Sequence, residues 1–130
     1  MSTRISSTVD FSSIVRPGDV IAWPQAIGEP LGLTQALVAQ KNYLPDFRLF
    51  IGMSMSDTLA PHNLANGAIL GLNGAGTNRR LTASGLIDVI PTHVSYVPQL
   101  LRSRIIPVDV VLIRARPTHL PGVYSTGVIC

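Results

Sequence analysis

Short apolar runs alternate along this sequence with segments of helical spacing. The clearest runs are residues 19–23, 86–91 and 108–114, and weaker ones cover residues 47–53 and 68–72. Strands that are apolar on both faces are typical of a parallel sheet covered by helices. We therefore predict an α/β fold with a mostly parallel sheet flanked by helices.

The segments between these runs predict the helices. Pro30 suits the first position of a helix, and apolar residues follow it at helical spacing to about residue 42. Asp10 is a candidate cap for a short helix, and residues 58–64 are ambiguous. Two further helices are predicted over residues 79–84 and 96–104.

The two ends of the sequence differ in character. Residues 1–9 are rich in Ser and Thr, so we expect them to be flexible. Residues 126–130 are apolar and resemble the start of another strand. We therefore expect residues 1–130 to form a single unit that is part of a larger domain.

The composition limits the partners. Charged residues make up 13% of the chain, about half of the roughly 25% usual in globular domains. So few charges predict a surface that is covered by a second subunit, by another copy of the chain or by a missing segment. The net charge is +3, but the arginines are scattered and aromatic residues are only 5% of the chain. A nucleic-acid binder would show a concentrated basic stripe, so we expect no nucleic-acid partner.

The cysteine content and the hydropathy bear on location. Cys130 is the only cysteine, so no internal disulfide can form, which fits a reducing compartment. The first residues are polar and lack the apolar core of a secretion signal. No apolar run approaches the length of a membrane span. These features predict a cytoplasmic protein without a membrane partner.

Ligands of open α/β sheets bind beyond the carboxyl ends of the strands. The loop after the first predicted strand contains Gln25, Gly28, Glu29 and Pro30. It leads into a helix, whose free N–H groups suit a phosphate or carboxylate. The alternative is structural: Glu29 would favour the helix dipole and Gly28 would relieve a tight turn.

A glycine-rich loop, residues 71–76, follows another predicted strand. Its spacing is not G-x-G-x-x-G, and no acidic residue ends the next strand, so a dinucleotide site is poorly supported. Gly74 and Gly76 instead indicate a turn where the backbone closely approaches another group.

His93 and Ser95 follow the predicted strand 86–91. A base and a nucleophile could be read there, but no G-x-S-x-G motif is present and loop polarity explains both residues. His93 is still well placed to meet a ligand. The three histidines are too dispersed for a local metal motif, and no cysteine cluster joins them. We therefore predict neither a metal site nor a catalytic residue in this chain.

Several motifs keep their order and spacing from about residue 14 to the end. They are Arg16-Pro17-Gly18-Asp19-Val20-Ile21, Gly28-Glu29-Pro30, Gly74-Ala75-Gly76 with Arg79, Gly85-Leu86-Ile87-Asp88-Val89-Ile90-Pro91-Thr92-His93-Val94-Ser95, Pro98, Asp109-Val110-Val111-Leu112-Ile113, Pro117, Gly122 and Ser125-Thr126-Gly127. With these motifs the chain resembles the acetyl-CoA hydrolase/transferase family, the CoA-transferases that act on acetate, 4-hydroxybutyrate and similar acids.

The resemblance implies a NagB/RpiA/CoA-transferase-like fold and the ligands of that family. These are an acyl-CoA and a small carboxylate, with coenzyme A as a substrate and no cofactor. Family members are longer chains of two similar halves, and their thioester-forming glutamate lies in the other half. Glu29 matches the Gly-Glu-Pro motif rather than the nucleophile motif. The resemblance therefore implies no catalytic residue here, but a substrate pocket lined by Gln25, Gly28, Glu29, Pro30, Gly74, Gly76, His93 and Ser95.

One loop departs from the family pattern. His119 and Pro121 stand where relatives often carry acidic and histidine residues, so the ligand contacts of this loop are not transferred. Two other interpretations stay open. One is a non-catalytic CoA-transferase-like module that binds a ligand or assembles with a second subunit. The other, a nucleotide-binding Rossmann domain, depends only on residues 71–76.

Overall fold

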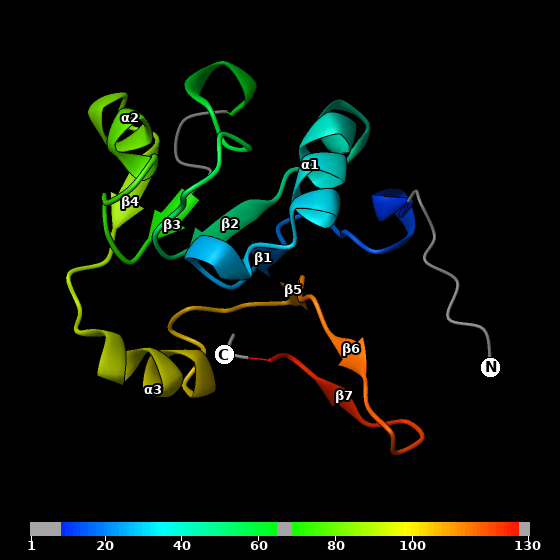
Figure 1. Cartoon of the computed structure of the whole chain (residues 1–130). Coiled ribbons are helices and arrows are strands. Elements are labelled where there is room, and N and C mark those ends of the chain that lie inside the picture. Colours follow the sequence, from blue (N-terminus) through cyan, green and yellow to red (C-terminus); the bar gives the residue numbers. More distant parts are fainter. Residues whose placement is uncertain (1–8, 65–68, 128–130) are drawn as a thin grey trace.

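The computed structural model describes residues 9–64 and 69–127. One sheet contains β1 (Val20–Ala22), β2 (Arg48–Ile51), β3 (Ile69–Gly71), β4 (Ile87–Val89) and β5 (Val110–Val111). All paired neighbours in it are parallel, and the strand order is β4-β3-β2-β1-β5 (Figure 1). The predicted parallel α/β fold is confirmed, and each of the five predicted runs contains one strand.

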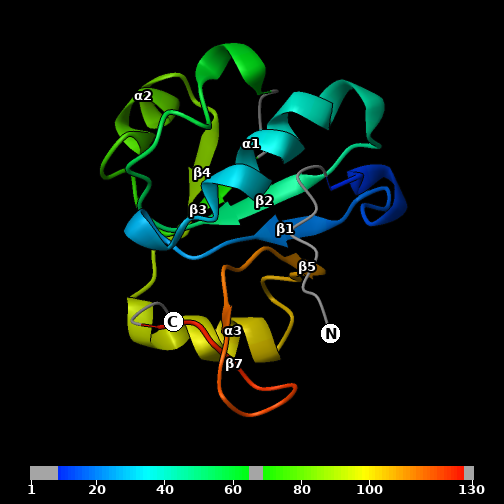
Figure 2. The same ribbon diagram turned by 45° about the vertical axis from the view of Figure 1, so that its right-hand side comes forward.

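The order of the strands explains where the helices lie. The chain moves from β1 to β4 in one direction, and α1 (Leu31–Gln40) and α2 (Asn78–Ala83) cover one face of the sheet. It then returns through α3 (Val97–Arg102) to place β5 on the other side of β1. Parallel crossovers are right-handed, so a reversal of direction puts the next helix on the opposite face. Figures 1 and 2 show α3 below the sheet, and α1 and α2 above it.

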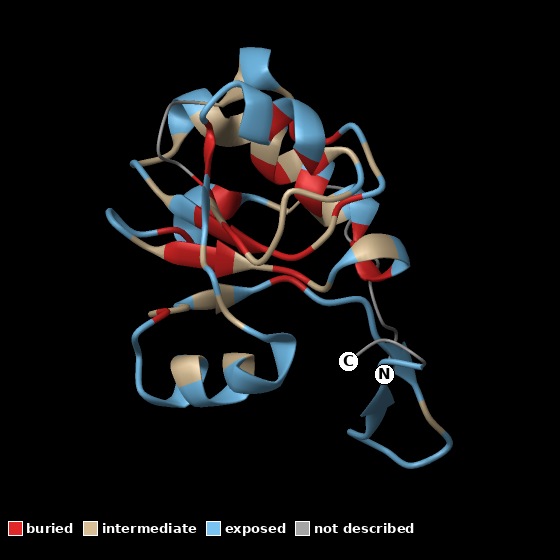
Figure 3. Cartoon of the chain, turned by 90° about the vertical axis from the view of Figure 1, so that its left-hand side faces the viewer, coloured by how far each residue is buried: buried red, intermediate tan, exposed pale blue. Residues whose placement is uncertain are grey.

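The two faces of the sheet hold cores of unequal size. Successive strand residues point to opposite faces, so Ile21 packs under the face of α1 and α2 while Val20 packs on the face of α3. The first core contains thirteen buried residues, among them Leu37 and Leu81. The second contains three, Val20, Phe50 and Ile106. No residue of α3 is fully buried, as its tan and blue ribbon in Figure 3 shows.

The prediction that the strands are buried on both faces is wrong at the edges of the sheet. Asp88 and Val89 of β4 and Val111 of β5 are exposed. The physical reason is that α3 alone covers the second face and that β4 and β5 each have one neighbouring strand. The predicted strand over residues 108–114 is also shorter than expected, because it pairs with β1 only at Val110 and Val111.

The helices largely follow the prediction. The helix after Pro30 ends at Gln40 and continues as a 3₁₀ turn, Lys41–Tyr43. Asp10 caps the 3₁₀ turn η1 (Phe11–Ser13), since the N–H of Ser12 donates to its carboxylate (2.9 Å). Two more 3₁₀ turns are Pro61–Asn63, within the ambiguous segment, and η5 (Val94–Tyr96), which precedes α3. Thus the predicted helix over residues 96–104 is divided between η5 and α3.

An antiparallel hairpin that the sequence did not predict closes the described chain. It pairs β6 (Arg116–Pro117) with β7 (Tyr124–Ser125), and all four of these residues are exposed. The expected strand at residues 126–130 falls mostly outside the described residues, as do residues 1–8 of the expected flexible segment. Val9 itself packs against the core and accepts a hydrogen bond from Gln40. Over the described ranges, no helix has the length and apolar character that a membrane span requires.

Candidate functional site

The loops that follow β1 and β2 are joined at the carboxyl end of the sheet. The backbone N–H of Met53 donates to Gln25 Oε1 (3.3 Å), and the N–H of Ala26 donates to the Met53 carbonyl (2.8 Å). Gly52 makes room for this contact, because a Cβ atom there would lie 2.6 Å from Gln25 Oε1. No local sequence pattern marks Gly52, since its role depends on how β1 and β2 align.

Ala26 has an unusual backbone in this loop. Its φ is +53°, a left-handed conformation that is uncommon for a residue with a Cβ. It opens the 3₁₀ turn η2 (Ala26–Gly28), and its N–H is held by Met53. Such strain persists where the surroundings determine the backbone, and it concentrates at functional sites. The strain marks the end of β1 as a candidate position for a ligand.

Glu29 is buried, with 5% of its surface exposed. Its Oε1 accepts a hydrogen bond from the Thr34 hydroxyl (2.8 Å), and its Oε2 accepts one from the Ser56 hydroxyl (2.7 Å). Gly28 and Pro30 on either side are also buried. Both carboxylate oxygens are therefore engaged inside the protein, and Glu29 holds the start of α1 against the segment after β2.

The glycine-rich loop packs against the same segment. Gly76 pairs with Ser54 in an isolated parallel bridge, has a φ of +66°, and would place a Cβ 2.0 Å from the Ser54 carbonyl oxygen. The Thr77 hydroxyl donates to the Ser56 carbonyl (2.7 Å). The predicted close approach of the backbone thus occurs, and its partner is this chain's own residues 54–56. Gly74 is close to Thr82, whose hydroxyl oxygen would lie 2.8 Å from an added Cβ.

Asn78 is a buried polar residue that the sequence analysis missed. Its side-chain amide donates to the carbonyl of Gly52 (2.9 Å), and its Oδ1 has no partner among the described residues. It thereby fixes the amino end of α2 against the end of β2. An asparagine directly after a glycine-rich loop was the available signal.

His93 and Ser95 form a separate local arrangement. Both are exposed, and the His93 Nδ1 lies 2.8 Å from the Ser95 hydroxyl and accepts the Ser95 N–H (3.2 Å). This is the capping pattern of η5. Within residues 9–64 and 69–127, no hydrogen bond joins either residue to the loops of Gln25, Glu29 or Gly76. Val94, between them, lines a cavity together with Gln25.

That cavity is an apolar groove of about 510 Å³ between α3 and the second face of the sheet. We call it the α3 groove. Residues at the ends of β1, β2 and β3 form its inner part, and η5, α3 and β5 contribute the outer part. Its lining comprises Ala22, Trp23, Pro24, Gln25, Phe50, Gly52, Leu72, Val94, Val97, Leu101, Val108, Val111 and Ile113.

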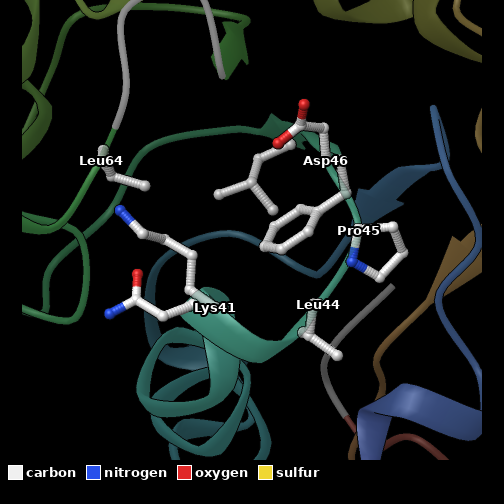
Figure 4. A pocket seen from close by; sticks show the side chains of 8 residues that line it. Lys41, Leu44, Pro45, Asp46 and Leu64 are labelled. Atoms are coloured by element: carbon white, nitrogen blue, oxygen red, sulfur yellow. The ribbon is translucent and has the colours of Figure 1, made fainter.

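A second cavity, of about 310 Å³, lies at the other end of β2 (Figure 4). Lys41, Leu44, Pro45 and Asp46 are among its lining residues, and the Lys41 ammonium donates to the carbonyl of Asn63. It faces the amino ends of the strands, away from the loops described above. Ligands of open parallel sheets bind at the carboxyl ends, so we assign this cavity no role.

The ionisable groups within the described ranges show no metal centre. No three of the histidine, cysteine, aspartate and glutamate residues there come together as metal ligands.

Two aspartates have a lowered pKa, and both lie away from the loops at the carboxyl ends of the strands. A hydroxyl and a backbone N–H of Ser12 lower the pKa of Asp10, and the Val20 N–H together with Arg104 lowers the pKa of Asp109.

Comparisons with known proteins agree with the motifs. The model of the acetyl-CoA hydrolase/transferase N-terminal domain matches residues 2–130. A succinyl-CoA:cyclohexane-1-carboxylate CoA transferase from Geobacter metallireducens is 27% identical over 119 residues. That match covers 82% of this chain but 24% of the relative's length. No solved structure matches the chain significantly.

Proposed function

We propose that this chain, which belongs to the acetyl-CoA hydrolase/transferase N-terminal domain family, is the N-terminal part of an enzyme that acts on CoA thioesters of small carboxylic acids. The family match over almost the whole chain is the observation that carries this proposal. The relative from Geobacter is a CoA transferase by name, which supports transfer of CoA between acids. The substrates would be an acyl-CoA and a free carboxylate, in a cytoplasmic and oligomeric enzyme.

The proposed reaction passes CoA to a glutamate and then to an acid or to water, which is nucleophilic catalysis by a carboxylate. We propose that this glutamate lies outside the 130 residues. Glu29 is the only glutamate in the chain, and both of its oxygens accept hydrogen bonds within the buried interior. A carboxylate held in this way has no path to a thioester carbonyl.

The residues at the strand ends would shape the substrate pocket. Gln25 is exposed at the groove. His93 and Ser95 are exposed on either side of Val94, which lines the groove. Glu29 and Gly76 would act indirectly, because their contacts fix the loops that carry the other residues. Gly28, Pro30 and Gly74 belong to the same two loops.

A chimera tests the proposed function. This chain would replace the matching segment of the Geobacter transferase, and CoA transfer from succinyl-CoA to cyclohexane-1-carboxylate would be followed by chromatography. We expect transfer well above the uncatalysed rate. The control is the same transferase with the segment deleted. A chimera that unfolds cooperatively but transfers no CoA would contradict the proposal.

The isolated chain gives a second prediction, which concerns Glu29. Neither the chain nor its Glu29→Gln variant should release CoA from acetyl-CoA at an enzymatic rate, with or without acceptor acids, because half of a site loses most of the benefit of positioning. In the chimera, Glu29→Gln should retain part of the activity, since an amide can still accept a hydrogen bond. Fast CoA release by the isolated chain that the substitution abolishes would make Glu29 the nucleophile.

A non-catalytic module is the alternative. One observation favours it for the isolated chain: within the described residues, Ser95 and His93 form a capping contact and no third group orients them. In that case the chimera would bind succinyl-CoA in equilibrium dialysis without turning it over.

A further inference from the structure

The α3 groove lies where the direction of the chain reverses in the sheet. β1 has β2 on one side and β5 on the other, and the groove is lined from both β1 and β5 by Ala22 and Val111. These two residues are paired in the parallel ladder. Crevices at such a reversal, beyond the carboxyl ends of the strands, are the usual ligand sites of open α/β sheets. The topology therefore gives the groove a functional position independent of its volume.

The lining of the groove defines what it can hold. Phe50 is buried in its wall, and two of its lining residues, Val111 and Ile113, expose 59% and 49% of their surfaces. Gln25 is the one lining residue with a polar side chain that can reach a ligand carboxyl or carbonyl oxygen, because the Trp23 side chain is buried in the core on the other face of the sheet. Its Oε1 is occupied by the N–H of Met53, and its Nε2 has no acceptor among the described residues. The groove is thus an apolar surface with an amide donor fixed at the strand ends.

The size of the groove favours acyl groups larger than acetyl. Its volume of about 510 Å³ lies in the range of roughly 300–1,000 Å³ that small-molecule sites occupy. An acetyl group would leave most of the apolar wall in contact with water. A ring or a branched chain would remove much more of that wall from water, and buried apolar area drives such binding.

We propose that the α3 groove binds the apolar part of a carboxylic acid or acyl group of ring or branched size, with the Gln25 amide donating to its carboxyl or carbonyl oxygen. This inference rests on the proposed function, because it assigns the substrate class of the same enzyme. It makes Val111 and Leu101 determinants of specificity. Val111 belongs to the Asp109–Ile113 motif, whereas Leu101 lies between motifs.

Trp23 allows a direct test in the isolated chain. It is the only tryptophan. It borders the groove and its side chain packs in the core of the other face, so its fluorescence reports a ligand that alters the packing at the end of β1. Cyclohexanecarboxylate should change the emission saturably, and acetate should need a concentration at least about tenfold higher for the same effect, because it buries far less apolar area. Amide shifts in NMR spectra should follow the same titration at Val94 and Val111.

Two matched variants locate the binding. Val111→Phe should fill the groove and weaken cyclohexanecarboxylate binding at least about tenfold. Val89→Phe is the control, since Val89 is a similarly exposed valine on the other edge strand, β4, and does not line the groove. It should bind as the parent chain does.

Three outcomes would overturn the inference: no saturable change with cyclohexanecarboxylate, equal binding of acetate, or equal weakening by both variants. The same experiments separate this inference from the proposed function.

If the chimera transfers no CoA but the chain binds cyclohexanecarboxylate, the proposed enzyme function is refuted and binding in the α3 groove stands. If the chimera is active but nothing binds in the groove, only the inference about the groove is refuted.

Discussion

At the scale of single residues, Gly76 shows why the glycine-rich loop has its sequence. A Cβ there would meet the Ser54 carbonyl oxygen at 2.0 Å, and the φ of +66° already disfavours other residues. The loop is therefore glycine-rich so that two stretches of this chain can touch. No dinucleotide is needed to explain it.

Gly76→Ala should lower the free energy of unfolding by more than about 3 kcal/mol, because left-handed strain of about 1–2 kcal/mol adds to a backbone collision. Gly122→Ala is the control, since Gly122 has a φ of +75° and nothing within 4 Å of an added Cβ. It should cost about 1–2 kcal/mol. Urea denaturation followed by circular dichroism measures both. Equal losses in the two variants would show that the contact with Ser54 contributes nothing.

The residues of the candidate site were predictable only in part. The strand-end loops, the close approach at Gly76 and the place of Glu29 before a helix follow from local patterns. The partners of these residues do not. Ser56 reaches Glu29, and Met53 reaches Gln25, across a sheet whose register no local pattern specifies. The role of Gly52 follows from that register and was therefore missed.

At the scale of elements, Asp109 joins the amino ends of β1 and β5. Its Oδ2 accepts the Val20 N–H (3.0 Å), its own N–H donates to the Val20 carbonyl (2.9 Å), and Arg104 pairs with Oδ1 (3.1 Å). The Val20 N–H and then Arg104 lower the pKa of this carboxyl in the folded protein. Ionised Asp109 therefore stabilises the junction of the two strands.

This arrangement predicts a pH dependence. The folded pKa lies below the unfolded value of about 3.9. Between the two, the unfolded chain binds more protons, so stability falls as the pH falls. The contribution of Asp109 is full above about pH 4 and is lost as the pH drops through the folded pKa. Asp109→Asn should remove this part of the acid dependence, measured as the urea midpoint from pH 2 to pH 7.

The control for Asp109 is Asp88→Asn, at an exposed strand residue outside the junction. If both variants kept the parent's acid dependence, the hydrogen bond to Val20 would not stabilise the fold.

Elements were the most predictable level of this structure. The apolar runs located every strand of the main sheet, helical spacing located α1, and α2 lies within one residue of the helix predicted over residues 79–84. The ends of the edge elements were less predictable, because they depend on what covers them. β5 stops pairing where β1 ends, and α3 begins after a 3₁₀ turn that His93 caps.

At the scale of the whole molecule, the sequence predicted the fold class but not the order of the strands. The reversal that puts β5 beside β1 leaves one face with a single helix. Apolar residues outside the α3 groove remain exposed around that face, including Ile105 and Tyr124. The low content of charged residues, 13%, is consistent with a face that is covered by other protein.

We therefore predict that the chain associates with itself. Sedimentation velocity should show a dimer or larger species whose fraction grows with protein concentration, because apolar patches of this kind favour contact. Ile105→Lys should shift the distribution toward the monomer, and Ile14→Lys, at an exposed position before β1, is the control. A monomer at all concentrations would contradict the prediction.

The strand order also bears on how the chain folds. Gln25 and Met53, which join the first two strand ends, are 28 residues apart, whereas Val20 and Asp109 are 89 residues apart. Closing the longer loop costs about 1 kcal/mol more in chain entropy. Non-local pairings of this kind slow folding. We expect β1 to β4 to assemble first and β5 to dock last, so that pulse-labelled amides of β2 become protected before those of Val111 and Leu112. On the ribosome, β1 to β4 would then leave the exit tunnel and pair before β5 does.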